Sequence, residues 1–194
     1  ENIGALKNTG FEIDLKGTLI HTRDFMWRMG VNLTHYKNVV TDLPLKDMPV
    51  TGVTRLKEGR SVYDFYLREW AGVDPDNGDP LWYKNVKDEQ GNITGRTTTN
   101  DYAQADYYYV DKSSLPKVYG GFNTAFSYKG FELSAIFAYS IGGYIVDRDV
   151  TMLWSNGSNP GRAWSTEILK RWTPENRYTD VPALKTVSNN WNSN

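Results

Sequence analysis

The run from residue 121 to residue 141 alternates between apolar and polar side chains on both sides of the dipeptide Lys129-Gly130. The apolar positions hold mainly aromatic and aliphatic residues. The positions between them hold Asn, Ser, Gly and Ala, with one charge at Glu132 and one apolar exception at Ile136. A period of two over this length predicts two β-strands with one apolar face, joined by a tight turn.

The N-terminal part of the chain repeats this design. Phe11, Ile13 and Leu15 alternate with charged residues, a turn is predicted at residues 21–24, and a second alternating strand follows. Its apolar positions are Phe25, Trp27, Met29, Val31 and Leu33. The sequence therefore predicts two long hairpins.

The length of these strands favours a membrane over water. Strands of soluble proteins are mostly about 5–6 residues long, whereas a tilted membrane-spanning strand needs about 9–11. The polar face of the second hairpin is also poor in the Lys and Glu that protect a solvated sheet. A transmembrane β-barrel with its apolar face toward lipid fits both observations. We predict the following lipid-facing residues: Phe25, Trp27, Met29, Val31, Leu33, Phe131, Leu133, Phe137, Tyr139 and Ile141.

A soluble antiparallel sheet with one face on a core also alternates. The alternative is therefore a soluble all-β glycan-binding or adhesin module. The two hypotheses differ in whether the apolar faces contact lipid or are sealed inside a compact sandwich.

The order of segments along the chain is short turn, long polar segment, short turn, long polar segment. The boundaries are a hairpin at about 7–38, a polar segment at about 43–115, a hairpin at about 117–143 and a polar segment at about 144–194. Outer-membrane barrels combine short periplasmic turns with long extracellular loops. This pattern predicts an all-β chain whose long segments lie outside the cell.

Local structure is also expected within the polar segments. Residues 81–86 and 93–99 are predicted to pair as a small hairpin around a turn at 87–92. In the C-terminal segment, Asn159-Pro160 predicts the start of one short helix. Trp164, Ile168 and Trp172 would form its apolar stripe, and Pro174 would end it.

Composition argues against several classes of function. The 22 Lys and Arg residues nearly balance 23 Asp and Glu, which disfavours a nucleic-acid partner. There are no cysteines, and the two histidines, His21 and His35, lie in a turn and near a strand end. We therefore predict no enzyme activity, no cofactor and no metal. The oxygen-rich residues Asp74 to Asp79 fit a turn better than a calcium loop.

Several motifs occur in a fixed order: NTGFE at residues 8–12, YDFY at 63–66, AGVDP at 71–75, GDPLWY at 78–83, PKVYGGF at 116–122, YKGFELS at 128–134 and RWTP at 171–174. Together they resemble the C-terminal part of the barrel in the SusC/RagA family of TonB-dependent outer-membrane transporters. The resemblance spans nearly the whole chain, and GFE at residues 10–12 and YKGFELS, in this order, are its more specific motifs.

The resemblance implies antiparallel membrane-spanning strands from a large outer-membrane barrel of the 22-stranded type, with the plug domain absent from this chain. It implies import of oligosaccharides or peptides, a SusD-like surface lipoprotein as a lid, and energy from TonB through the missing N-terminal part. We predict substrate or lid contacts at Trp70, Trp82, Tyr83 and Tyr108. Packing inside a folded loop is the alternative role for these aromatic residues.

Overall fold

The computed structural model describes the chain except for residues 1–3, 46–47, 50, 155–160, 162 and 186–194. It divides into two compact units. The first comprises Glu1–Phe65 and Asp111–Ile145, and the second comprises Tyr66–Val110 and Val146–Asn194. Within the described residues, no helix has the length and apolar character needed to cross a membrane.

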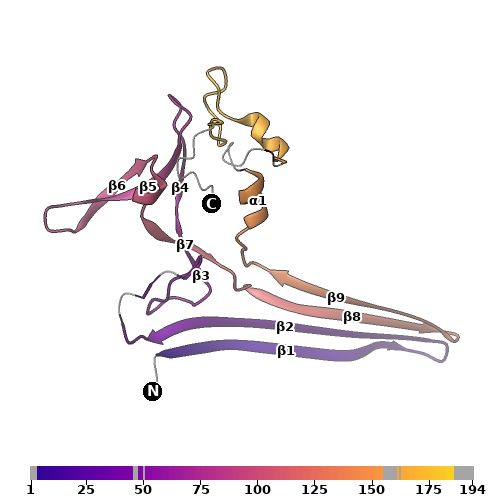
Figure 1. Ribbon diagram of the computed structural model, residues 1–194. Helices are drawn as coiled ribbons and strands as arrows, with labels where there is room; N and C mark the ends of the chain where they lie inside the picture. Colours follow the sequence, from indigo (N-terminus) through magenta and orange to yellow (C-terminus); the bar gives the residue numbers. More distant parts are fainter. Residues whose placement is uncertain (1–3, 46–47, 50, 155–160, 162, 186–194) are drawn as a thin grey trace. The chain divides into compact units, whose positions relative to one another are not determined.

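The first unit is built on a four-stranded antiparallel sheet in the order β1-β2-β8-β9 (Figure 1). Its strands are β1 (Ala5–His21), β2 (Phe25–Asp42), β8 (Val118–Tyr128) and β9 (Phe131–Ile141). They contain 17, 18, 11 and 11 residues, well above the length usual in soluble sheets. Both predicted long hairpins are confirmed.

The second hairpin turns on two residues in the left-handed region. Lys129 has a φ of 47° and Gly130 a φ of 91°. Two successive positive φ values are typical of the type I′ turn, whose twist matches that of the flanking strands. The tight turn predicted at Lys129-Gly130 is therefore confirmed.

The register of the sheet brings the apolar positions of all four strands onto one face. Val31 lies opposite Leu15 on one side and Phe122 on the other, and Phe122 lies opposite Phe137. The rings of Phe122 and Phe137 stack with their centroids 4.3 Å apart. The ten residues predicted to face lipid all belong to this face, because the pairing keeps their alternation in step.

The opposite face is polar. It carries an ion pair of 3.0 Å between Arg28 and Glu132 across strands, and one of 2.9 Å between Lys16 and Asp14. Asn32 of this face accepts a hydrogen bond from the backbone N–H of Gly121. The sheet thus separates an apolar surface from a hydrogen-bonding one.

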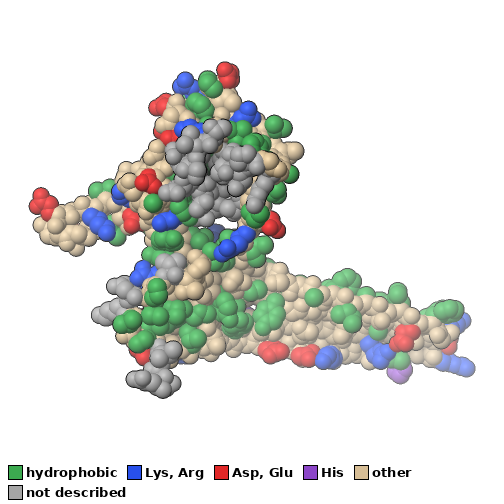
Figure 2. Space-filling view, viewed as in Figure 1, with side chains coloured by type: hydrophobic (Ala, Val, Ile, Leu, Met, Phe, Trp, Pro, Cys, Tyr) green, Lys and Arg blue, Asp and Glu red, His purple; other side chains and the backbone are tan. Residues whose placement is uncertain are grey.

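The hydrophobic core of the described residues does not lie on the apolar face. Phe131 is 81% exposed, Leu133 69% and Ile141 61%, and Figure 2 shows hydrophobic side chains exposed along the sheet. The buried apolar residues are Val40, Phe65, Trp82, Ala105, Ile168, Val181 and Ala183, none of which was predicted to face lipid. A sealed sandwich would have buried Phe131, Leu133 and Ile141, so the structure does not favour the soluble alternative.

The second unit contains a three-stranded sheet in the order β4-β5-β6. The strands are β4 (Trp70–Val73), β5 (Pro80–Lys87) and β6 (Ile93–Thr99). The predicted small hairpin is confirmed as β5 and β6. Two further strands, β3 (Asp64–Arg68) and β7 (Tyr107–Ser113), pair with each other. The boundary between the two units falls within each of them, after Phe65 in β3 and after Val110 in β7.

The helices of this unit are short: α1 (Arg148–Leu153) and the 3₁₀ helices η1 (Tyr102–Gln104) and η2 (Thr166–Lys170). The predicted helix around Trp164, Ile168 and Trp172 is wrong in the part that the structure describes, and its proposed start at 159–160 lies outside it. Only η2 forms there, because Trp172 is engaged elsewhere. The backbone N–H of Trp172 donates to Val181 O, and the indole N–H of Trp172 donates to Pro75 O.

Candidate functional site

Three of the four aromatic residues predicted as contacts lie on the small sheet of the second unit, and Tyr108 of β7 reaches it through Asn85. The four occupy two different faces of the sheet. Adjacent residues of a strand point to opposite sides, so Trp82 and Tyr83 of β5 are separated. Trp82 is 1% exposed. Its ring packs edge to face on Trp70 at 5.8 Å and on Tyr102 at 5.1 Å between centroids. The structure therefore corrects the prediction for Trp82, which serves packing.

Tyr83 and Tyr108 enclose a cation on the other face. The central carbon of the Arg96 guanidinium lies 4.1 Å from the centroid of each ring. Arg96 also makes an ion pair of 2.7 Å with Glu69. We call Tyr83, Arg96, Tyr108 and Glu69 the arginine sandwich. Both charged side chains keep about 40% of their surface exposed, so the group is accessible from solvent.

The strand register explains how this group forms. Arg96 of β6 lies opposite Asn85 of β5, and Asn85 shares a face with Tyr83. Tyr108 reaches the same face because its hydroxyl donates to Asn85 Oδ1 at 2.9 Å. Asp106 aligns the segment before Tyr108 by accepting from Asn85 N at 2.7 Å.

The surroundings of Tyr108 and Arg96 raise the pKa of both groups. Burial raises the pKa of Tyr108, against the opposing influence of the nearby Arg96. Burial alone would lower the pKa of Arg96, but its hydrogen bonds to Glu69 and Tyr108 outweigh that effect and raise it. The site therefore presents a neutral phenol and a fixed cation. Such a group can stack and donate hydrogen bonds.

Sequence reasoning identified the aromatic residues but missed Arg96, Glu69 and Tyr102. The signal for Arg96 was present in principle, because the predicted hairpin between 81–86 and 93–99 already places it near Asn85. Fixing that partner requires the register, which shifts between Val86 and Lys87.

Two carboxylates of the Asp74–Asp79 loop, those of Asp74 and Asp79, are occupied by the chain itself. Asp74 accepts from Asp76 N at 2.9 Å and from Asn77 Nδ2 at 3.0 Å. Asp79 accepts from Asn100 Nδ2 at 2.9 Å and pairs with Lys185. Gly78 has a φ of 74°, as a tight turn requires. The loop is the turn that the sequence favoured.

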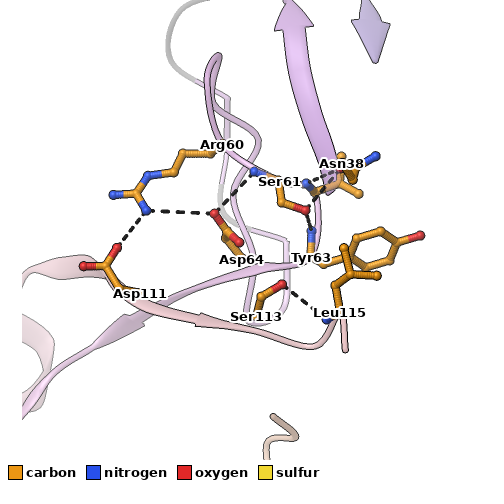
Figure 3. A network of polar contacts seen from close by, with 9 residues as sticks. Asn38, Arg60, Ser61, Tyr63, Asp64, Asp111, Ser113 and Leu115 are labelled. Atoms are coloured by element: carbon orange, nitrogen blue, oxygen red, sulfur yellow. Dashed lines mark hydrogen bonds and ion pairs between the residues drawn. The ribbon is translucent and has the colours of Figure 1, made fainter. Parts of the chain in front are cut away.

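A polar network closes the free edge of β2 in the first unit (Figure 3). Asn38 is 5% exposed, and its Oδ1 accepts from Val62 N at 3.0 Å and from Ser61 Oγ at 3.2 Å. Its Nδ2 donates to Asn8 Oδ1 at 2.8 Å. The backbone of Val40 also exchanges hydrogen bonds with the loop, accepting from Gly59 N and donating to Arg60 O.

An ion-pair network lies beside it. Arg60 pairs with Asp111 at 2.8 Å and with Asp64 at 3.9 Å. Asp111 has a φ of 52°, a left-handed conformation that Asp tolerates better than most residues. These contacts fix residues 57–64 against the segment that leads into β8.

A scan against models of known protein families finds no match. The chain is similar to TonB-dependent receptor P3 of Formosa agariphila, with 28% identity over 94% of this chain and 19% of the relative. It is also similar to TonB-dependent receptor SusC of Bacteroides thetaiotaomicron, with 28% identity over 75% of this chain and 15% of the relative.

Among solved structures, the RagAB peptide transporter superposes with a TM-score of 0.81 and 32% identity, covering 95% of this chain and 20% of that one. The RagAB peptide importer in its open-open state gives a TM-score of 0.76 and 29% identity over 97% of this chain. The chain thus spans about a fifth or less of the length of these relatives. These relatives are receptors and transporters, not enzymes. By its sequence and its strand arrangement, the chain is a segment of a SusC/RagA-type TonB-dependent receptor.

Proposed function

We propose that this chain supplies part of the barrel wall and of the outer loops of a TonB-dependent outer-membrane importer of oligosaccharides or peptides. The observation that carries the proposal is the single-layer sheet with one uncovered apolar face and one polar face. Such a sheet is stable between lipid and a wet lumen. The partners that fit are a SusD-like surface lipoprotein and TonB, and the location is the bacterial outer membrane.

Two polar groups on the apolar face, the indole of Trp27 and the hydroxyl of Tyr139, are satisfied locally, as a lipid environment requires. The indole N–H of Trp27 donates to Thr124 Oγ1 at 2.9 Å. The hydroxyl of Tyr139 donates to Asn32 O at 2.8 Å. An unsatisfied donor in hydrocarbon costs several kcal/mol, so these bonds make the face compatible with acyl chains.

The unpaired edges of the sheet favour a place for it within a larger, closed barrel. In the described residues β1 pairs only with β2, and β9 only with β8. Open edges leave backbone N–H and C=O groups unpaired, which the hydrocarbon region does not tolerate. A barrel removes such edges by closing on itself. We therefore propose that further strands flank β1 and β9 in the working protein.

Trp70, Tyr83 and Tyr108 remain our proposed contacts for a substrate or lid, now with Arg96 added. The half-buried tyrosine rings are held rigid by the cation between them. A preorganised aromatic surface binds at a lower entropic cost than a mobile one. Both sugars and peptides have surfaces that stack on such rings.

The test is a nitroxide scan of β9 in the polypeptide that carries this segment, reconstituted in lipid. Single cysteines at Leu133 and Phe137 probe the apolar face, and cysteines at Ser134 and Ala138 are the matched controls on the polar face. We expect high collision rates with oxygen at the first pair, and high rates with a water-soluble nickel complex at the second. Equal access of the nickel complex to all four positions would refute a lipid-facing sheet.

A further inference from the structure

A hollow of about 440 Å³ lies at the end of β2 in the first unit. It forms because β8 begins at Val118, so that the pairing of β2 with β8 ends at Thr34 while β2 continues to Asp42. The loop at 59–64 and the segment at 113–117 complete its walls, and Figure 3 shows the polar contacts that hold them. The residues that matter for its chemistry are His35, Lys37, Val39, Leu115, Pro116 and Lys117.

The hollow carries positive charge that the chain does not neutralise. Lys37 and Lys117 are both exposed. Across the described residues, neither side chain takes part in an ion pair or hydrogen bond. The acidic group on the wall, Asp64, is occupied by Arg60 and by the backbone N–H of Ser61. Two lysines therefore lack a counter-ion beside a cavity large enough for a small polar group.

The position of the hollow links it to the apolar face. Leu33, His35 and Lys37 are alternate residues of β2 and lie on the same face of the sheet. Leu33 belongs to the predicted lipid-facing set, and the ring of His35 packs on Phe11 with centroids 5.5 Å apart. Lys37 thus lies where the apolar band ends, and Lys117 lines the same hollow. Lysines at such a boundary extend their ammonium groups toward the headgroup region.

We infer that this hollow binds the phosphate-bearing headgroup of an outer-leaflet lipid, with Lys37 and Lys117 as its cationic ligands. The inference rests on the proposed function, which places the strand ends opposite the tight turns at the outer surface. Basic pockets beside membrane-spanning elements select anionic lipids, at roughly 1 kcal/mol for each Lys near the surface. Leu33 and Ile141 lie on the adjoining apolar face, where the acyl chains of that lipid would rest. A free anion would gain nothing from this adjacency.

The experiment titrates lipid A into the delipidated polypeptide that carries this segment, in neutral detergent, and follows binding by native mass spectrometry. The test variant is Lys37→Gln with Lys117→Gln. The matched control is Lys84→Gln with Lys87→Gln on β5, which removes the same charge from the other unit. We expect affinity for lipid A to fall about thirtyfold in the test variant and to change less than about twofold in the control.

A second variant, Lys37→Arg with Lys117→Arg, keeps the charge and is expected to retain binding. Unchanged affinity in the Gln variant overturns the inference, as does equal weakening in the β5 control. Displacement of lipid A by an equimolar amount of inorganic phosphate also overturns it, because the site would then recognise a free anion. The nitroxide pattern of β9, recorded in the same variants, separates failure of this site from failure of the membrane assignment. Heat-modified mobility on gels confirms that each variant is folded.

Discussion

Replacing Asn38 by alanine should release the loop at 57–64 from the edge of β2. The amide of Asn38 accepts from Val62 N and Ser61 Oγ and donates to Asn8, and it is almost fully buried. In the variant, Val62 N–H loses its acceptor in a partly buried position, which costs about 1–3 kcal/mol. The hydroxyl of Ser61 and the amide of Asn8 can turn toward water. Their lost bonds therefore add about 1 kcal/mol.

The expected total is a loss of about 2–4 kcal/mol in the local stability of the loop. Hydrogen exchange measured by mass spectrometry reports this quantity directly, because a locally opening segment exchanges in proportion to its opening constant. Peptides covering 57–64 should exchange about 30- to 1000-fold faster than in the unmodified protein. Peptides from β8 and β9 should not change.

Asn38→Asp is the informative control. A carboxylate keeps both acceptor roles, and Asn8 can rotate its amide nitrogen to donate in place of accepting. We expect this variant to release the loop less than Asn38→Ala does, because it keeps the hydrogen bonds and loses only the free energy of burying a charge. Asn123→Ala, on the same polar face but away from the loop, should leave 57–64 unaffected. If Asn38→Ala leaves exchange of 57–64 unchanged, the side-chain network is not what holds the loop, and the backbone bonds at Val40 suffice.

Three further predictions follow from single positions. Gly120→Ala should prevent normal pairing of β2 with β8, because its Cβ would lie 2.1 Å from Asn32 O; loss of heat-modified gel mobility checks this, and a folded, normally migrating variant would contradict it. Trp82→Ala should destabilise the second unit by about 3–5 kcal/mol, read as a lower urea midpoint, whereas a midpoint equal to that of the original protein would show that the ring is not part of a core. Asn92 chiefly, with backbone N–H groups, lowers the pKa of Asp88. The Asp88 carboxylate therefore stabilises the β5–β6 turn above its unfolded pKa of about 3.9. This stabilisation is lost as the pH falls through the lower pKa that Asp88 has in the folded protein. Hydrogen exchange at 87–92, corrected for intrinsic pH dependence, should rise only in that acidic window and should lose this pH dependence in Asp88→Asn.

Local pattern was enough to predict the four long strands, their turns and their apolar face. The alternation around Lys129-Gly130 and around residues 21–24 determines two hairpins, because a one-residue slip would move every apolar side chain to the wrong face. The same logic predicted the β5–β6 hairpin. Where periodicity was the wrong guide, as at Trp164, Ile168 and Trp172, long-range hydrogen bonds of Trp172 decided the outcome.

The sequence by itself determined the two-faced strands and, through ordered motifs, the transporter family. Only the tertiary structure decided that β2 pairs with β8, that Trp82 is buried while Tyr83 is not, and that Arg96 lies between two tyrosines. The reason is physical. Periodicity depends only on residues that are close together in the sequence, whereas strand order, burial and stacking depend on contacts between residues that are distant along the chain.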